Sequence, residues 1–181
     1  MARHAESSRY FRQIGGVRVL RRYGEGSAHI PQETLPNFFS GDGKLTLRQL
    51  ATNYKGYFKN SVYQGLQVGE PEVGSRNTLS LNIRHNVKSS VGDHYYRTWV
   101  IIERRTLKDK YTVDNKARVK CTCPAFHYFA AYADVTSKNF AGNPSSWNRV
   151  AAKIKNPYSI PILCKHITAV TNDIVRRKIL E

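Results

Sequence analysis

The three cysteines of this chain lie in two short motifs, Cys121-Thr122-Cys123 and Cys164-Lys165-His166, and no other cysteine is present. Three cysteines cannot all pair as disulfides. Three thiolates and one imidazole, in contrast, complete the tetrahedral shell that a structural zinc ion prefers. The sequence therefore predicts one closed Cys₃His site for a single structural Zn²⁺, formed by Cys121, Cys123, Cys164 and His166.

Three other interpretations of these residues stay open at the level of sequence. His127 lies four residues after Cys123 and could replace His166 if the turn after Pro124 brought it inward. The cysteines could instead be small buried hydrophobic residues beside a core histidine. A redox-active Cys-x-Cys pair is a third possibility, although only the general positive charge nearby favours a depressed thiol pKa.

The flanking sequence indicates how the ligands are presented. Residues 116–121 alternate basic with small or apolar side chains, which predicts a strand, and residues two apart on a strand face the same side. Pro124 should end this strand and begin a short helix over 125–132. Leu163, Ile167, Val170 and Ile174 recur at helical spacing, so Cys164 and His166 should lie in the first turn of a C-terminal helix.

The remaining periodic segments predict a small antiparallel sheet with helices, an α+β fold. Residues 78–84 alternate and should place Leu79, Leu81 and Ile83 on one face, and residues 95–103 should pair with the strand over 116–121. A helix is predicted from Thr46, its N-cap, to Val62. Its aromatic stripe is more typical of a packed core than of a base-stacking platform.

The chain is predicted to divide into an extended basic arm over 1–44 and a folded body over 45–181. Within the body, a zinc module covers about 95–181 and contains an insertion over 134–161, where Trp147 should pack the segment down. An arm with little core of its own loses too much conformational entropy to order alone. We therefore expect it to order only against a partner.

Charge is the second strong feature, because 29 Lys and Arg against 13 Asp and Glu give a net charge of +16. Such a chain attracts polyanions. Charge reports the sign of a partner but not its identity, so nucleic acid and the acidic surface of a protein both remain open. The predicted contact residues are Arg104, Arg105, Lys108, Lys110, Arg176, Arg177 and Lys178.

Several classes of protein are disfavoured. No apolar run approaches the roughly 20 residues needed to cross a bilayer, and the start lacks the apolar core of a secretory signal. Gly15-Gly16 interrupts the arginine-rich start, which argues against a transit peptide. The acidic residues form no pattern suited to acid–base catalysis, and no phosphate-binding glycine loop is present. We expect a non-enzymatic protein without a small-molecule substrate, made in a reducing cytoplasm.

Cys-x-Cys followed by Cys-x-His, on a hairpin and then a helix, resembles the SWIM-type zinc finger over about 95–180. Residues 124–163 separate the two ligand pairs, a longer interval than the usual SWIM spacer. The extended motif Cys-x-Cys-Pro-Ala-Phe-x-Tyr, with Ile160-Pro161-x-Leu163-Cys164-Lys165-His166, resembles sequences of SWIM-like proteins of tailed bacteriophages. Several of those proteins are virion components.

This resemblance implies that the same four residues are the ligands. It also implies a structural protein of the neck, tail or baseplate region of a virion, made in the host cytoplasm and contacting neighbouring virion proteins. The alternative that it implies is a cytoplasmic SWIM-type module that binds DNA or RNA.

Overall fold

A computed structural model describes residues 10–14, 17–21, 43–57, 65–143 and 161–181. The chain divides into two compact units, Met1–Ser40 and Gly41–Glu181. In the first unit, β1 (Tyr10–Ile14) and β2 (Val17–Arg21) pair as an antiparallel hairpin. The expectation that the arm orders only against a partner falls largely on residues outside the described ranges and stays a prediction.

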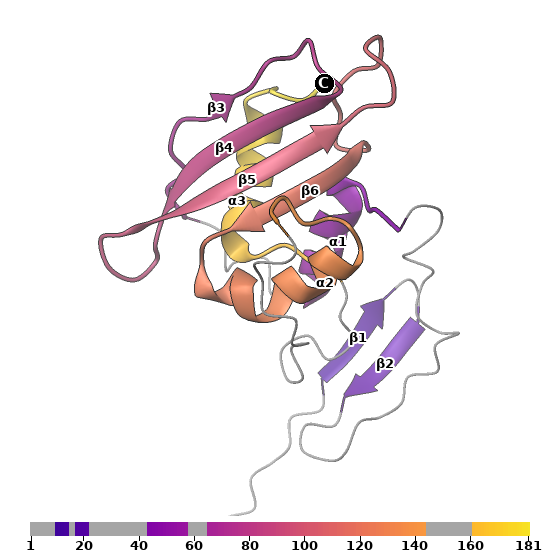
Figure 1. Ribbon diagram of the computed structural model, residues 1–181. Coiled ribbons are helices and arrows are strands. Elements are labelled where there is room, and N and C mark those ends of the chain that lie inside the picture. Colours follow the sequence, from indigo (N-terminus) through magenta and orange to yellow (C-terminus); the bar gives the residue numbers. More distant parts are fainter. Residues whose placement is uncertain (1–9, 15–16, 22–42, 58–64, 144–160) are drawn as a thin grey trace, which may run out of the picture. The chain divides into compact units, whose positions relative to one another are not determined.

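The second unit is built on an antiparallel sheet in the order β3-β4-β5-β6, shown in Figure 1. Its strands are β3 (Glu72–Val73), β4 (Ser80–Lys88), β5 (Tyr95–Glu103) and β6 (Lys116–Cys121). Each of β4, β5 and β6 alternates buried with more exposed side chains, so the sheet has one core face and one outer face. The predicted strands over 95–103 and 116–121 are confirmed with the same bounds.

Helices cover the core face of the sheet. They are α1 (Leu47–Tyr57), α2 (Ala131–Thr136), which continues from the π-helical turn η3 (Phe126–Ala130), and α3 (Lys165–Arg176). Figure 1 shows α3 crossing behind the sheet, with α1 beside it and α2 below β6. The predicted α+β class is therefore confirmed.

The start of α1 follows the sequence prediction. The Gln49 N–H donates to the Thr46 hydroxyl at 3.1 Å, and the Thr46 N–H donates to the Gln49 side-chain oxygen at 2.9 Å. This reciprocal pair is a capping box, which satisfies two backbone donors at the helix start. The helix ends at Tyr57, and the predicted continuation to Val62 lies outside the described residues.

The core lies between the sheet and the helices. Leu47 and Leu50 of α1 are fully buried, as are all four apolar residues predicted to form one face of the C-terminal helix. Leu81 and Ile83 also belong to this core. Leu79 does not, because β4 begins at Ser80 and leaves its side chain 52% exposed. The prediction that Leu79 shares the buried face was wrong.

The first residues of the predicted insertion over 134–161 are part of the fold. Asn139 is fully buried, and Phe140 forms a parallel bridge with Val119 of β6. The Asn139 side chain accepts the Leu45 N–H at 3.0 Å and donates to the carbonyls of Leu45 and Ala117 at 2.9 and 2.6 Å. This side chain therefore joins the segment before α1 to β6. Trp147 lies outside the described residues.

Candidate metal centre

Two separate elements present the four candidate ligands. Cys121 is the last residue of β6, and Cys123 lies in the turn that precedes η3. Cys164 is the N-cap of α3, and His166 lies in the first turn of that helix. The centre therefore lies between the end of the sheet and the start of the C-terminal helix, as the sequence predicted.

The four ligand atoms are close enough for one metal ion. All four residues are buried, and their ligand atoms lie within 4.8 Å of one another. Zn–S bonds of about 2.3 Å in a tetrahedron place two sulfur atoms about 3.8 Å apart. A contraction of about 1 Å or less would bring these four ligands to zinc-binding distances. The chemistry of the set, three soft sulfurs and one imidazole nitrogen, also fits zinc.

Backbone amides are directed at the sulfur atoms. The Cys123 N–H donates to Sγ of Cys121 at 3.4 Å, and the Phe126 N–H donates to Sγ of Cys123 at 3.3 Å. Hydrogen bonds to a sulfur favour its thiolate form, which is the form that binds metal. The turn 121–126 therefore directs one backbone donor at each of two sulfur atoms, and Pro124 within it lacks an N–H that would need a partner.

Burial and hydrogen bonding shift the pKa values of the three thiols in different directions. Burial raises the pKa of Cys121 and of Cys164, whereas hydrogen bonds from the Cys121 and Cys164 side chains lower the pKa of Cys123. Burial therefore favours the protonated form of Cys121 and Cys164, and their side chains stabilise the thiolate of Cys123. A divalent cation would displace the thiol protons. Its charge would also offset the repulsion between three thiolates held this close together.

His166 completes the set. Its Nδ1 lies 4.0 Å from Sγ of Cys121, and its Nε2 is buried without a hydrogen-bond partner in the described part of the chain. The Tyr96 ring packs against the imidazole, with ring centroids 4.7 Å apart. His127 is exposed and contacts the Tyr128 ring instead. The structure therefore selects His166 over His127 as the nitrogen ligand.

Four of the seven basic residues predicted to contact a partner interact within the unit. Arg104 donates to the carbonyls of Thr78, Asp109 and Arg76 and covers the Tyr111 ring. Lys110 pairs with Glu181 at 2.5 Å. Arg176 and Arg177 both pair with Asp173, and Arg177 also pairs with Glu70.

The other three predicted contact residues, Arg105, Lys108 and Lys178, are exposed and form no ion pair with another described residue. Partner binding by the full set of seven stays a prediction.

Sequence reasoning did not single out the basic residues of the outer sheet face. Arg84 and Arg97 are exposed on the neighbouring strands β4 and β5. Arg84 lies opposite the partly exposed Trp99 in the register, and Arg97 precedes Trp99 by two residues on the same strand. The alternation within each strand indicated which residues face outward. The register between strands, which the sequence does not display, brings them together.

No helix in the described parts of the chain is both long and apolar enough to cross a membrane. Comparison with protein-family models, with curated proteins and with solved structures found no match. The centre is therefore interpreted from its own geometry, as a buried Cys₃His cluster compatible with a zinc finger.

Proposed function

We propose that this protein is a non-enzymatic assembly protein whose fold is held by one structural Zn²⁺ bound to Cys121, Cys123, Cys164 and His166. The observation that carries this proposal is the burial of all four ligands in one cluster. Catalytic zinc sites keep a position open for water or substrate, whereas structural sites are closed by four protein ligands. The metal would therefore serve the scaffold, and the protein would act through its surface.

Metal analysis of the purified, reduced protein tests the zinc assignment. We expect one zinc ion per chain, and we expect Co²⁺ substituted for it to give the visible absorption of a tetrahedral thiolate site. His166→Ala should lower the zinc content. His127→Ala, which removes an exposed histidine, is the matched control and should not. Clearly substoichiometric zinc in the wild-type protein would contradict the assignment.

The proposed setting is a tailed-phage particle, in which the protein would join neighbouring virion proteins. This setting is supported by two motifs, Cys-x-Cys-Pro-Ala-Phe and Ile-Pro-x-Leu-Cys-Lys-His, which resemble sequences of SWIM-like phage proteins. Mass spectrometry of purified virions is the direct test, and the chain should be found there at a fixed ratio to the known structural proteins. Its absence from purified particles, together with replication or recombination genes beside its own gene, would contradict this setting.

The second candidate function is a SWIM-type module that binds DNA or RNA. Six arginines and three glutamates lie in Met1–Ser40, so +13 of the net charge of +16 belongs to Gly41–Glu181. A compact unit with this excess of positive charge attracts polyanions strongly at low ionic strength. The outer face of its sheet, where basic residues surround a tryptophan, specifically favours this candidate.

A further inference from the structure

The outer face of the sheet has an aromatic residue at its centre and cations around it. Arg84 of β4, Trp99 of β5 and Lys120 of β6 lie directly opposite one another in the register of the three strands. One step along the sheet, Asn86 of β4 lies opposite Arg97 of β5. All five side chains belong to the set that alternates with the buried residues, so they project away from the core.

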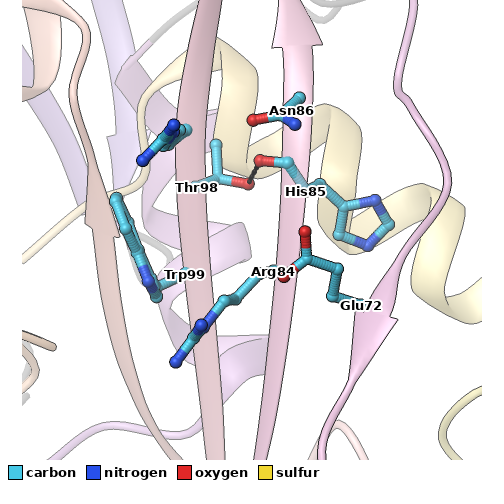
Figure 2. A pocket seen from close by; sticks show the side chains of 7 residues that line it. Glu72, Arg84, His85, Asn86, Thr98 and Trp99 are labelled. Atoms are coloured by element: carbon cyan, nitrogen blue, oxygen red, sulfur yellow. Dashed lines mark hydrogen bonds between the residues drawn. The ribbon is translucent and has the colours of Figure 1, made fainter.

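These residues surround a shallow depression, shown in Figure 2. Its volume is about 220 Å³. Arg84 and Arg97 line it with positive charge and Trp99 with an aromatic ring, and Asn86 and Glu72 of β3 also line it. Figure 2 shows Trp99 and Arg84 projecting from neighbouring strands on the same side of the sheet. Pockets for whole small-molecule ligands measure about 300–1,000 Å³. The depression therefore suits one planar group of a longer ligand better than a complete small molecule.

The charges around the depression are available to a ligand. Neither the Arg84 nor the Arg97 guanidinium forms an ion pair with any other described residue, unlike Arg177, which pairs with both Asp173 and Glu70. The Lys120 ammonium lies over the Trp99 ring, 5.0 Å from its centroid. A base that stacks on this face of the ring would displace the ammonium to the ring edge, from where it can reach a flanking phosphate.

Negative charge on this face is limited. The Glu103 carboxylate is neutralised by Lys44 and Arg118, each at 2.7 Å. Among the described residues, Glu72 is the one acidic residue that lines the depression, and it lies opposite Arg84 in the register. The balance of charge beside Trp99 is therefore positive.

We propose that this outer face binds single-stranded nucleic acid, with Trp99 stacking on a base and with Arg84, Arg97 and Lys120 contacting the flanking phosphates. The inference deepens the second candidate function and rests on it. A base exposes its faces for stacking only when it is unpaired, and exposed aromatic residues on a basic sheet face bind such bases without needing a specific sequence. The Asn86 amide is placed to donate to or accept from a base edge.

A fluorescence experiment on the full-length, zinc-loaded protein tests this assignment. The chain has two tryptophans, so Trp147→Phe leaves Trp99 as the single reporter. The probes are oligo-dT and oligo-U of about 12 nucleotides, within the range of ~4–16 nucleotides that single-strand sites cover. We expect both to quench Trp99, whereas a duplex of the same length should bind through charge without quenching. A difference in affinity between oligo-dT and oligo-U identifies DNA or RNA as the preferred ligand.

Affinity measurements on variants locate the site. Trp99→Ala should weaken binding of the labelled oligonucleotide by about 5- to 150-fold, the range for one lost base–aromatic stack, and Trp99→Phe should restore part of this loss. Arg84→Gln should lower the slope of log affinity against log salt by about 0.7, the value for one phosphate contact on a single strand. Lys138→Gln is the matched control, since it removes one positive charge from an exposed residue that does not line the depression and is not among the seven predicted contact residues.

The outcomes separate the site from the function. Quenching together with a loss at Trp99 and Arg84 well above that of the control supports the proposal. Tight binding that Trp99→Ala and Arg84→Gln weaken no more than Lys138→Gln does would overturn this site and leave the second candidate function standing. Absence of binding at low salt would overturn both. Equal competition by polyglutamate would show an acidic protein surface to be an equivalent ligand and would overturn base stacking. Unchanged zinc content and melting temperature establish that each variant is folded.

Discussion

At the scale of single residues, Asn139 gives the clearest link between sequence and stability. Its side chain is fully buried and is hydrogen-bonded to two backbone segments far apart in the chain. Asn139→Ala would leave the Leu45 N–H and part of the Ala117 carbonyl without a partner, and each such buried group costs about 1–3 kcal/mol. We expect the free energy of unfolding to fall by about 2–4 kcal/mol in denaturant titrations. Asn172→Ala, at an exposed position of α3, should change it by less than about 0.5 kcal/mol.

Asp134 predicts a pH dependence at the same scale. It is fully buried, and neither carboxylate oxygen has a hydrogen-bond partner in the described part of the chain. Burial raises its pKa well above the ordinary value of 3.8, and the nearby Ile162 backbone amide offsets only part of this shift. The folded state therefore keeps a proton that the unfolded state has lost above about pH 4. It follows that the contribution of Asp134 to stability declines as the pH rises from there towards the raised pKa.

Asp134→Asn removes this titration. The variant should match the wild type near pH 4 and become progressively more stable than the wild type as the pH rises towards the raised pKa, with a slope of at most about 1.4 kcal/mol per pH unit. The difference between the two proteins cancels the thiol titrations that both share. Asp93→Asn, whose carboxylate is almost fully exposed, should show no such divergence. A pH-independent difference for Asp134→Asn would contradict the assignment.

At the scale of elements, the metal centre joins the end of β6 to the start of α3, two elements that contact each other directly. Structural zinc can contribute on the order of 10 kcal/mol, which is comparable to the whole stability of ~5–15 kcal/mol of a typical domain. Cys164→Ser or treatment with a strong chelator should therefore abolish cooperative unfolding of the C-terminal half, measured by calorimetry. Thr122→Ser, between the two sulfur ligands, is the control. An unchanged melting temperature after Cys164→Ser would identify the cysteines as packing residues.

The elements also show how far sequence reasoning reaches. Strands over 95–103 and 116–121, the cap at Thr46 and the four clustered ligands could all be predicted, because each depends on local alternation, spacing or residue type. The π-helical turn η3 and the role of Asn139 could not. The conformation of η3 depends on the path of the backbone directly after Cys123. The role of Asn139 depends on a hydrogen bond to Leu45, 94 residues away in the sequence. The depression beside Trp99 depends on the register of three strands, which single-strand patterns do not contain.

At the scale of the whole molecule, the division at residue 40 separates two predicted roles. The sheet, the metal ligands and most of the positive charge belong to Gly41–Glu181. A truncated protein that begins at Gly41 should therefore keep one zinc ion, unfold cooperatively and bind single strands within about threefold of the full-length affinity, because the removed segment carries only +3 of the net charge of +16. Fluorescence titration and metal analysis measure these properties together.

The same truncation should remove the chain from assembled particles, since the arm is the segment expected to order against neighbouring subunits. Trp99→Ala has the opposite pattern, because it should weaken single-strand binding while leaving incorporation intact. If removing residues 1–40 instead abolished nucleic-acid binding and left incorporation unchanged, the two roles would have to be exchanged between the units. The arginines of the arm would then supply the phosphate contacts, and the outer sheet face would be the surface that contacts neighbouring virion proteins.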